Sequence, residues 1–105
     1  MKVIFSFFLL ICSSLTFAQK ESGMTLYENH CGECHREGGE GTYIMEQRLG
    51  EAQSILVERS NLSAVYIRQV VRAGLGSMAK LENQELSNSE LERITDYLLE
   101  SARPN

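Results

Sequence analysis

Large aromatic side chains are scarce in this 105-residue sequence, and proline is almost absent. There is no tryptophan, the single proline is Pro104, and all four phenylalanines lie within the first 18 residues. Beyond residue 18 the aromatic residues are four tyrosines, Tyr27, Tyr43, Tyr66 and Tyr97. A short chain with so few large apolar side chains has a thin hydrophobic core. Such small domains usually need a disulfide, a metal or a cofactor, so the sequence indicates that something other than side chains fills the centre.

Positive charge is also in short supply. Ten Lys and Arg residues stand against 14 Asp and Glu residues, which gives a formal net charge of −4 at pH 7. Nucleic-acid phosphates are bound mainly by Lys and Arg. The acidic balance therefore argues against a nucleic-acid partner, and it selects no other partner.

The only long apolar run lies at the N-terminus. Lys2 precedes the almost uninterrupted apolar stretch Val3–Cys12, and Ser13–Ala18 is rich in small and polar residues. This order of a positive start, an apolar stretch and a small residue at the end is typical of a cleaved secretory signal peptide. We therefore predict that residues 1–18 are a signal peptide and that residues 19–105 form one domain, because the length allows no more.

Two alternatives for this N-terminal run are weaker. A membrane anchor needs about 20 apolar residues, and this run is shorter and contains serines. A lipid-modified N-terminus at Cys12 would normally need Gly or Ala before the cysteine, where this chain has Ile11.

Two cysteines remain beyond the signal peptide, and a histidine directly follows the second. The motif Cys31-Gly32-Glu33-Cys34-His35 is the signature of c-type haem attachment. Two thiols three residues apart on a helical turn can both form thioethers with the vinyl groups of one porphyrin. The adjacent imidazole is then held under the ring, where it can ligate the iron. Covalent attachment of haem takes place outside the cytoplasm, so the motif and the signal peptide together predict a periplasmic protein with one haem c.

Three other interpretations of the motif stay open. A C-x-x-C pair can be a thiol–disulfide redox centre, although such pairs usually follow a strand and none is predicted before Cys31. Zinc could bind Cys31, Cys34 and His35 or His30, but a closed site needs four ligands and a second pair is missing. The third interpretation is a chance occurrence of the pattern.

The remaining pattern predicts an all-α domain with three main helices. The first spans Ser22–Cys31, the second spans Ser63–Ala73 with Ser63 as its N-cap, and the third begins at the capping box of Ser87 and Glu90 and carries the apolar stripe Leu91, Ile94 and Leu98. Glycines predict loops at Arg36–Thr42 and Leu75–Leu86. Residues 43–59 are compatible with strand or helix.

A haem iron that carries electrons needs a second axial ligand, and a methionine is the natural candidate. Met45 fits a role in core filling, as methionines in helical segments commonly do. Met78 lies in a glycine-containing loop between two helices, where the backbone can approach the open side of a porphyrin. We therefore predict that His35 and Met78 are the metal ligands.

Together these features resemble a class I c-type cytochrome, a family of single-electron carriers rather than enzymes. The resemblance is carried by Cys31–His35, Gly74, Met78 and the Leu91–Leu98 helix and covers about Gly23 to Leu99. It implies a small cytochrome c fold in which the first and last helices cross, with Gly23 and Tyr27 against Tyr97 and Leu98, and in which the porphyrin completes the core. The family usually has proline after the ligand methionine, where this chain has Ala79.

A narrower likeness is carried by Leu26-Tyr27 before Cys31 and by Tyr66-Ile67, Val71-Arg72, Gly74 and Met78. These residues resemble the cytochrome subunit of the p-cresol methylhydroxylase group. The likeness implies a flavoprotein dehydrogenase as the electron donor and places Arg72 near a haem propionate. A solvated arginine that is favoured by the dipole at its helix end is an equal alternative. Two other functions stay open, namely a haem enzyme or gas sensor with an open iron position, and a thiol–disulfide oxidoreductase.

Overall fold

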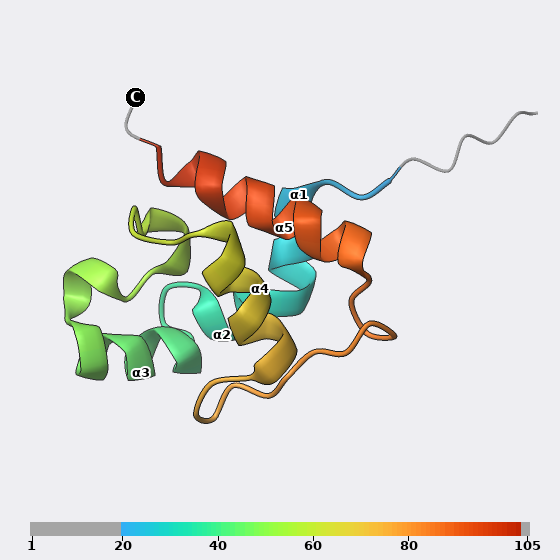
Figure 1. Cartoon of the computed structure of the whole chain (residues 1–105). Coiled ribbons are helices and arrows are strands. Elements are labelled where there is room, and N and C mark those ends of the chain that lie inside the picture. Colours follow the sequence, from blue (N-terminus) through green and yellow to red (C-terminus); the bar gives the residue numbers. More distant parts are fainter. Residues whose placement is uncertain (1–19, 104–105) are drawn as a thin grey trace, which may run out of the picture.

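The computed structural model describes residues 20–103, and within them the chain is helical and contains no strand (Figure 1). Its elements are, in order, α1 (Gly23–Tyr27), the π-helical turn η1 (Glu28–Gly32), α2 (Glu33–His35), α3 (Glu40–Leu49), the 3₁₀ turns η2 (Glu51–Gln53) and η3 (Leu56–Glu58), α4 (Ala64–Ala73) and α5 (Asn88–Ser101). The all-α class and the cytochrome-like arrangement of helices are confirmed. The signal peptide predicted for residues 1–18 lies outside the described residues.

The first predicted helix is present and longer than expected. It begins after Ser22, whose hydroxyl accepts a hydrogen bond from the Thr25 amide at 3.2 Å. Helical backbone then continues through η1 and α2 to His35, and it ends because Arg36 is extended, with φ −74° and ψ 168°. The complete C-x-x-C-H motif therefore lies on one continuous helical segment.

The loop predicted for Arg36–Thr42 is wrong over its second half, because α3 already begins at Glu40. Extended backbone at Gly39 starts the helix, and the Thr42 hydroxyl donates to the Arg36 carbonyl at 2.7 Å. Gly41 lies inside the helix, where a Cβ atom would come within 2.8 Å of the Cys34 carbonyl oxygen. The range left ambiguous, 43–59, holds the rest of α3 and the turns η2 and η3. This fourth helix adds to the three that the sequence predicts.

The other two helices begin where the sequence predicts. Ser63 caps α4 by accepting a hydrogen bond from the Tyr66 amide at 3.2 Å. At α5 the capping box is complete, since the Ser87 hydroxyl accepts from the Glu90 amide at 3.2 Å and the Glu90 carboxylate accepts from the Ser87 amide at 3.0 Å. Leu86 and Leu91 on either side of the cap are both buried.

The core lies where α1 and α5 cross, with α4 packed beside them (Figure 1). A Cβ atom at Gly23 would overlap the Arg93 carbonyl oxygen and lie 2.9 Å from the Tyr97 Cβ, so only glycine allows this approach. The rings of Tyr27 and Tyr97 meet with centroids 5.5 Å apart. The buried apolar residues are Leu26, Tyr27, Ile67, Val71, Leu86, Leu91, Ile94 and Leu98. This is the helix crossing that the resemblance implies.

Within residues 20–103, every helix is too short or too polar to cross a membrane.

Candidate haem site

The two cysteines of the motif are unpaired. Cys31 is partly buried and packs against the core, whereas Cys34 is exposed. Burial, with a smaller contribution from Cys34, raises the pKa of the Cys31 thiol to about 11. A reactive redox cysteine instead needs a lowered pKa, because the thiolate is the nucleophile. Cys31 therefore lacks the lowered pKa that the thiol–disulfide interpretation would predict for a nucleophilic thiol.

His35 ends the same helical segment and is partly buried. Its Nδ1 atom is buried and has no hydrogen-bond partner among the described residues. A Cβ atom at Gly41 would lie 3.3 Å from the His35 Cε1, so the start of α3 fits closely against the imidazole ring. Burial lowers the pKa of His35, which favours the neutral imidazole that can ligate a metal.

Met78 is presented by a tight turn between α4 and α5. The amide of Met78 donates to the Leu75 carbonyl at 2.9 Å, and the amide of Leu75 donates back to the Met78 carbonyl at 3.0 Å. Gly74 and Gly76 adopt positive φ values of 76° and 59°, which glycine accepts without strain. Met78 is partly buried and packs against the same core cluster as Cys31.

Met45 lies elsewhere, on α3, and is partly buried as well. It is not among the partly buried residues that pack against the core cluster. The structure thus brings Met78, rather than Met45, to the cluster that Cys31 contacts.

Arg72 lies in the last turn of α4, and its guanidinium is bound within the protein. Nη1 donates to the Leu81 carbonyl at 2.9 Å, and Nη2 donates to the Asn88 Oδ1 at 2.8 Å. The predicted contact with a haem propionate stays a prediction, while these two bonds tie α4 to the loop and to the start of α5.

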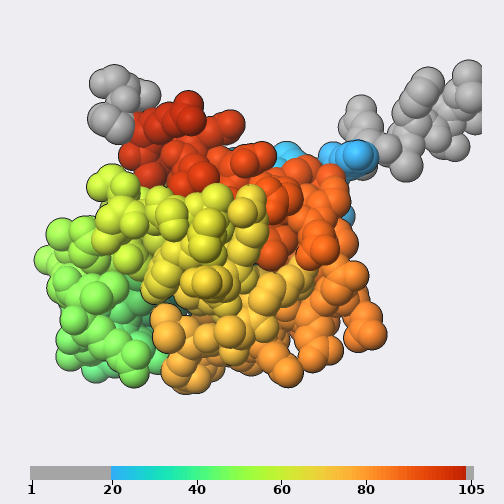
Figure 2. All heavy atoms as spheres, in the orientation of Figure 1, coloured from blue at the N-terminus to red at the C-terminus, as the bar shows by residue number. Residues whose placement is uncertain are grey.

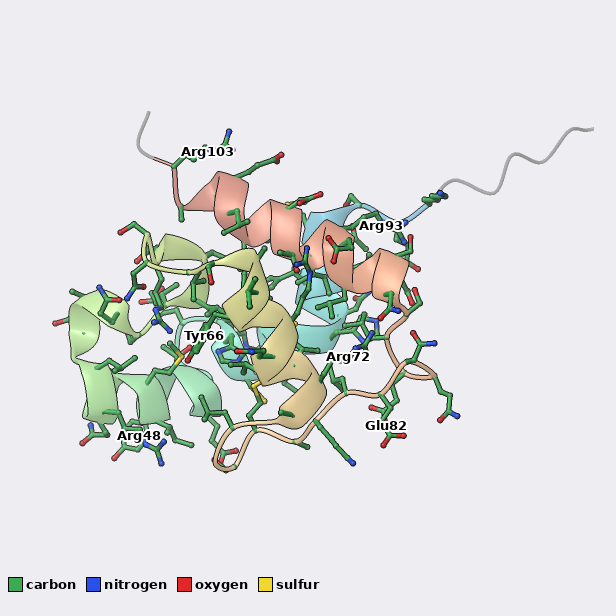
Figure 3. All side chains as sticks on the ribbon, viewed as in Figure 1. Arg48, Tyr66, Arg72, Glu82, Arg93 and Arg103 are labelled. Carbon is green, nitrogen blue, oxygen red and sulfur yellow. The ribbon has the colours of Figure 1, made fainter. Side chains whose placement is uncertain are left out.

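The surface between these elements is hollowed, and exposed apolar side chains of α4 and the Met78 loop include Tyr66 and Leu75. In Figure 2 a narrow hollow separates the green surface of α3 from the yellow and orange surface of α4 and the Met78 loop, and teal atoms of the α2 region lie at its bottom. Tyr66, which Figure 3 labels between α4 and α3, and Leu75 are 43% and 53% exposed. Apolar side chains around an opening of this kind are what a buried porphyrin would cover.

These residues fit a covalently attached haem. The two unpaired thiols can form thioethers, and the imidazole and the thioether of Met78 are the ligand types that cytochromes use. A zinc site is not supported, because among residues 20–103 no three side chains of His, Cys, Asp or Glu come together to hold a metal ion.

Sequence reasoning missed two features of this site. Gly41 lets the start of α3 approach Cys34 and His35, because it has no side chain. It lies in a glycine-rich stretch, so the sequence pattern indicates a loop residue there. Arg48 from α3 reaches the turn beside Met78, so that a Cβ atom at Gly76 would lie 3.6 Å from its Nη1. Neither contact has a signal in the local sequence.

Comparison with known proteins shows the family of the chain. Residues 18–98 match the family model described as cytochrome C oxidase, cbb3-type, subunit III. The chain is also 28% identical over 99 residues to the cytochrome c subunit of 4-cresol dehydrogenase (hydroxylating) from Pseudomonas putida, which covers 91% of this chain and 76% of that protein. No solved structure matches. A covalently bound haem c is the cofactor of such domains. With the family model matching most of its length, the chain belongs to the c-type cytochrome family described as cytochrome C oxidase, cbb3-type, subunit III.

Proposed function

We propose that this chain is exported, loses residues 1–18, and works in the periplasm as a single-electron carrier with one haem c. The observation that carries the proposal is the joint placement of the motif and Met78, since Cys31 and Met78 pack against the same core from different elements. The family match, which begins at residue 18 where the proposed signal peptide ends, supports the domain boundary.

Different residues of the chain would attach the haem and ligate its iron. Cys31 and Cys34 would attach it, and His35 and Met78 would ligate its iron. When bound, the haem supplies an iron that takes up and releases one electron. The fit of Gly41 against His35 holds the imidazole in place, and the turn at Leu75–Met78 holds the second ligand.

Covalent attachment is tested on protein exported by a host with haem-maturation machinery. The mass of the purified protein should exceed that of residues 19–105 by one haem, and acid–acetone should not extract the pigment. Replacing both cysteines by serine should abolish attachment. A wild-type mass equal to the bare polypeptide would end the proposal.

Axial ligation is tested by Met78→Ala, with Met45→Ala as the matched control. Loss of the Met78 thioether should remove the weak long-wavelength sulfur-to-iron band and lower the reduction potential, because His/Met ligation raises it. Met45→Ala should do neither, and the reverse pattern would move the ligand role to Met45. Rapid binding of carbon monoxide by the reduced wild-type protein would instead favour an open iron position, as in a haem enzyme or gas sensor.

The proposed electron donor is a flavoprotein dehydrogenase. The likeness to the cytochrome c subunit of 4-cresol dehydrogenase supports a dehydrogenase partner. The turn around Met78 offers a surface for close docking, because Leu75, Gly76, Ser77 and Ala79 are all exposed and uncharged. The cations near this turn include Lys80, which pairs with Glu82 at 3.4 Å, and Arg48 from α3, whose guanidinium lies beside Gly76.

Stopped-flow reduction by candidate donors tests this surface. The association rate should vary only weakly with ionic strength, since shape and apolar contact dominate there. Ala79→Lys should slow reduction by adding a solvated charge to the contact. A steep salt dependence, or reduction that is unaffected by Ala79→Lys, would place the docking surface elsewhere.

A further inference from the structure

The loop that carries Met78 is hydrogen-bonded back to α4 at Leu81. The Leu81 amide donates to the Val71 carbonyl at 2.8 Å, and the Leu81 carbonyl accepts from Arg72 Nη1 at 2.9 Å. Both backbone groups of Leu81 are therefore bound to the last turn of α4. At the other end of the loop the Gly74 amide donates to the Val70 carbonyl at 2.8 Å. The turn Leu75–Met78 and the two residues after it are held between these points.

Arg72 also fixes where the loop enters α5. Its Nη2 donates to Asn88 Oδ1 at 2.8 Å. The backbone amide of Asn88 donates to Asn83 Oδ1 at 3.2 Å, which holds Asn88 against the loop. Figure 3 shows Arg72 on the side of α4 that faces the returning loop. One guanidinium thus joins three elements, and rigid planar geometry makes arginine suited to such a bridge.

Arg68, one turn earlier on α4, gives an instructive contrast. Its guanidinium binds the Glu92 carboxylate on α5 at 2.6 and 2.8 Å, so it too links α4 to α5 but does not touch the loop. Within residues 20–103 Arg72 forms no ion pair, and its two partners are neutral oxygens of the loop and of the helix start.

We propose that Arg72 is a positioning residue that keeps the Met78 loop closed over the site by binding Leu81 and Asn88. The inference rests on the proposed role of Met78 as an iron ligand. It differs from the propionate role that the sequence predicts for Arg72, because the guanidinium acts on the backbone that carries the ligand. Loss of this bridge would free the segment of the loop that returns to α4, so that Met78 would be held at the site for less of the time.

The test uses the haem-loaded protein and the variants Arg72→Met, Arg72→Lys and Asn88→Ala, with Arg68→Met as the control. Two readouts report on the loop, namely the rate at which the reduced protein binds carbon monoxide and the hydrogen exchange rate of the Leu81 amide. Arg72→Met should raise both by about tenfold, because a hydrogen bond from a charged group is lost at each opening. Asn88→Ala should raise them less, and Arg72→Lys should restore part of the wild-type behaviour.

Arg68→Met should leave both rates unchanged, although it removes an ion pair between the same two helices. The proposal is overturned if Arg72→Met leaves both rates at the wild-type level, or if Arg68→Met raises them equally. A change of reduction potential alone, with both rates unaltered, would assign Arg72 to a propionate instead. Should Arg72→Met fail to fold, Asn88→Ala and Arg72→Lys give the same comparison. A wild-type protein without the sulfur-to-iron band would overturn the role of Met78, whereas Leu81 exchange would still test the bridge.

Discussion

The region where α1 crosses α5 and the region around α3, α4 and the Met78 loop differ in how far their apolar side chains are buried. Where α1 crosses α5, the protein packs against itself, and residues such as Leu26 and Leu98 are only 1% and 2% exposed. Between α3, α4 and the Met78 loop, apolar side chains such as Tyr66 and Leu75 stay open to solvent. The crossing depends on the absence of a side chain at Gly23, whereas the open half depends on a loop that glycines and Arg72 hold in place.

This difference shows how a thin core can suffice. Among residues 20–103, eight buried apolar residues make up the core, and they gather at the crossing and the adjoining faces of α4 and α5. The other half carries the predicted ligands His35 and Met78 and exposes apolar side chains such as Tyr66 and Leu75. A covalently bound haem would therefore act there as a structural component, which agrees with the family of the chain. The comparison predicts that substitutions in the two halves have different signatures.

The largest effect is expected at the crossing. In Gly23→Ala the new Cβ would overlap the Arg93 carbonyl oxygen, and helix backbone cannot rotate away as a side chain could. We expect a loss of about 4 kcal/mol in the free energy of unfolding, above the usual ~1–3 kcal/mol for overpacking. Denaturant unfolding of the haem-loaded protein measures it, and the sulfur-to-iron band should persist in the molecules that stay folded.

Gly32→Ala is the matched control for this substitution. Gly32 lies in the same helical segment, and a Cβ atom there meets nothing nearer than 3.7 Å. It should therefore be neutral, or stabilising by up to about 1 kcal/mol through helix propensity. Equal destabilisation by the two variants would mean that the close approach of α1 and α5 does not determine stability.

A smaller loss, with a different signature, is expected in the open half. Gly74 has φ 76° and ψ 168°, a region that is essentially limited to glycine, and a Cβ atom there would lie 2.8 Å from the Met78 carbonyl oxygen. Gly74→Ala should cost about 3 kcal/mol and also weaken the sulfur-to-iron band, since the turn that carries Met78 must shift.

A comparison with Gly50 separates the cost of backbone strain from the cost of the contact between the new Cβ and the Met78 carbonyl. It ends α3 with φ 88° and ψ 163°, and no atom lies within 4 Å of the position of its Cβ. Gly50→Ala should therefore cost about 2 kcal/mol from backbone strain alone and leave the band intact. If Gly50→Ala weakens the band as much as Gly74→Ala does, the position of Met78 does not depend on the contact with Gly74.

The sequence predicted those parts of the fold that depend on neighbours along the chain. The N-caps at Ser63 and Ser87 each involve a residue three positions later, so their signal lies within one turn. The helix crossing at Gly23 was implied by resemblance to a family, not by any local pattern. The start of α3 was not predicted, because Gly41 is tolerated there through its fit against Cys34 in another element.

The same division holds for the candidate site. Cys31, Cys34 and His35 form a contiguous motif, so their joint role could be proposed from the sequence. Met78 required a choice between two methionines. The structure packs Met78 against the core cluster, and its role as a ligand stays a prediction. The bonds of Arg72 to Leu81 and Asn88 join residues 9 and 16 positions apart. No local pattern encodes such contacts, because they exist only once the loop has closed.

The smallest effect on stability is expected at the capping box that starts α5, and it depends on pH. The Ser87 amide and then the Ser87 hydroxyl lower the pKa of the Glu90 carboxyl, with smaller contributions from His30 and Arg93. A carboxyl whose pKa is lower in the folded state stabilises the fold above its unfolded pKa, and this stabilisation is lost as the pH falls through the folded pKa.

Glu90→Gln should therefore lower stability slightly at pH 7 and flatten the acid dependence of unfolding below about pH 4.5. Thermal unfolding of both proteins between neutral and acidic pH measures this. Glu100→Gln is the control for loss of a charge on the same helix, because it leaves both the cap and the ion pair of Arg68 with Glu92 intact. If Glu90→Gln keeps the full acid dependence of the wild type, the capping box is not the source of that stability.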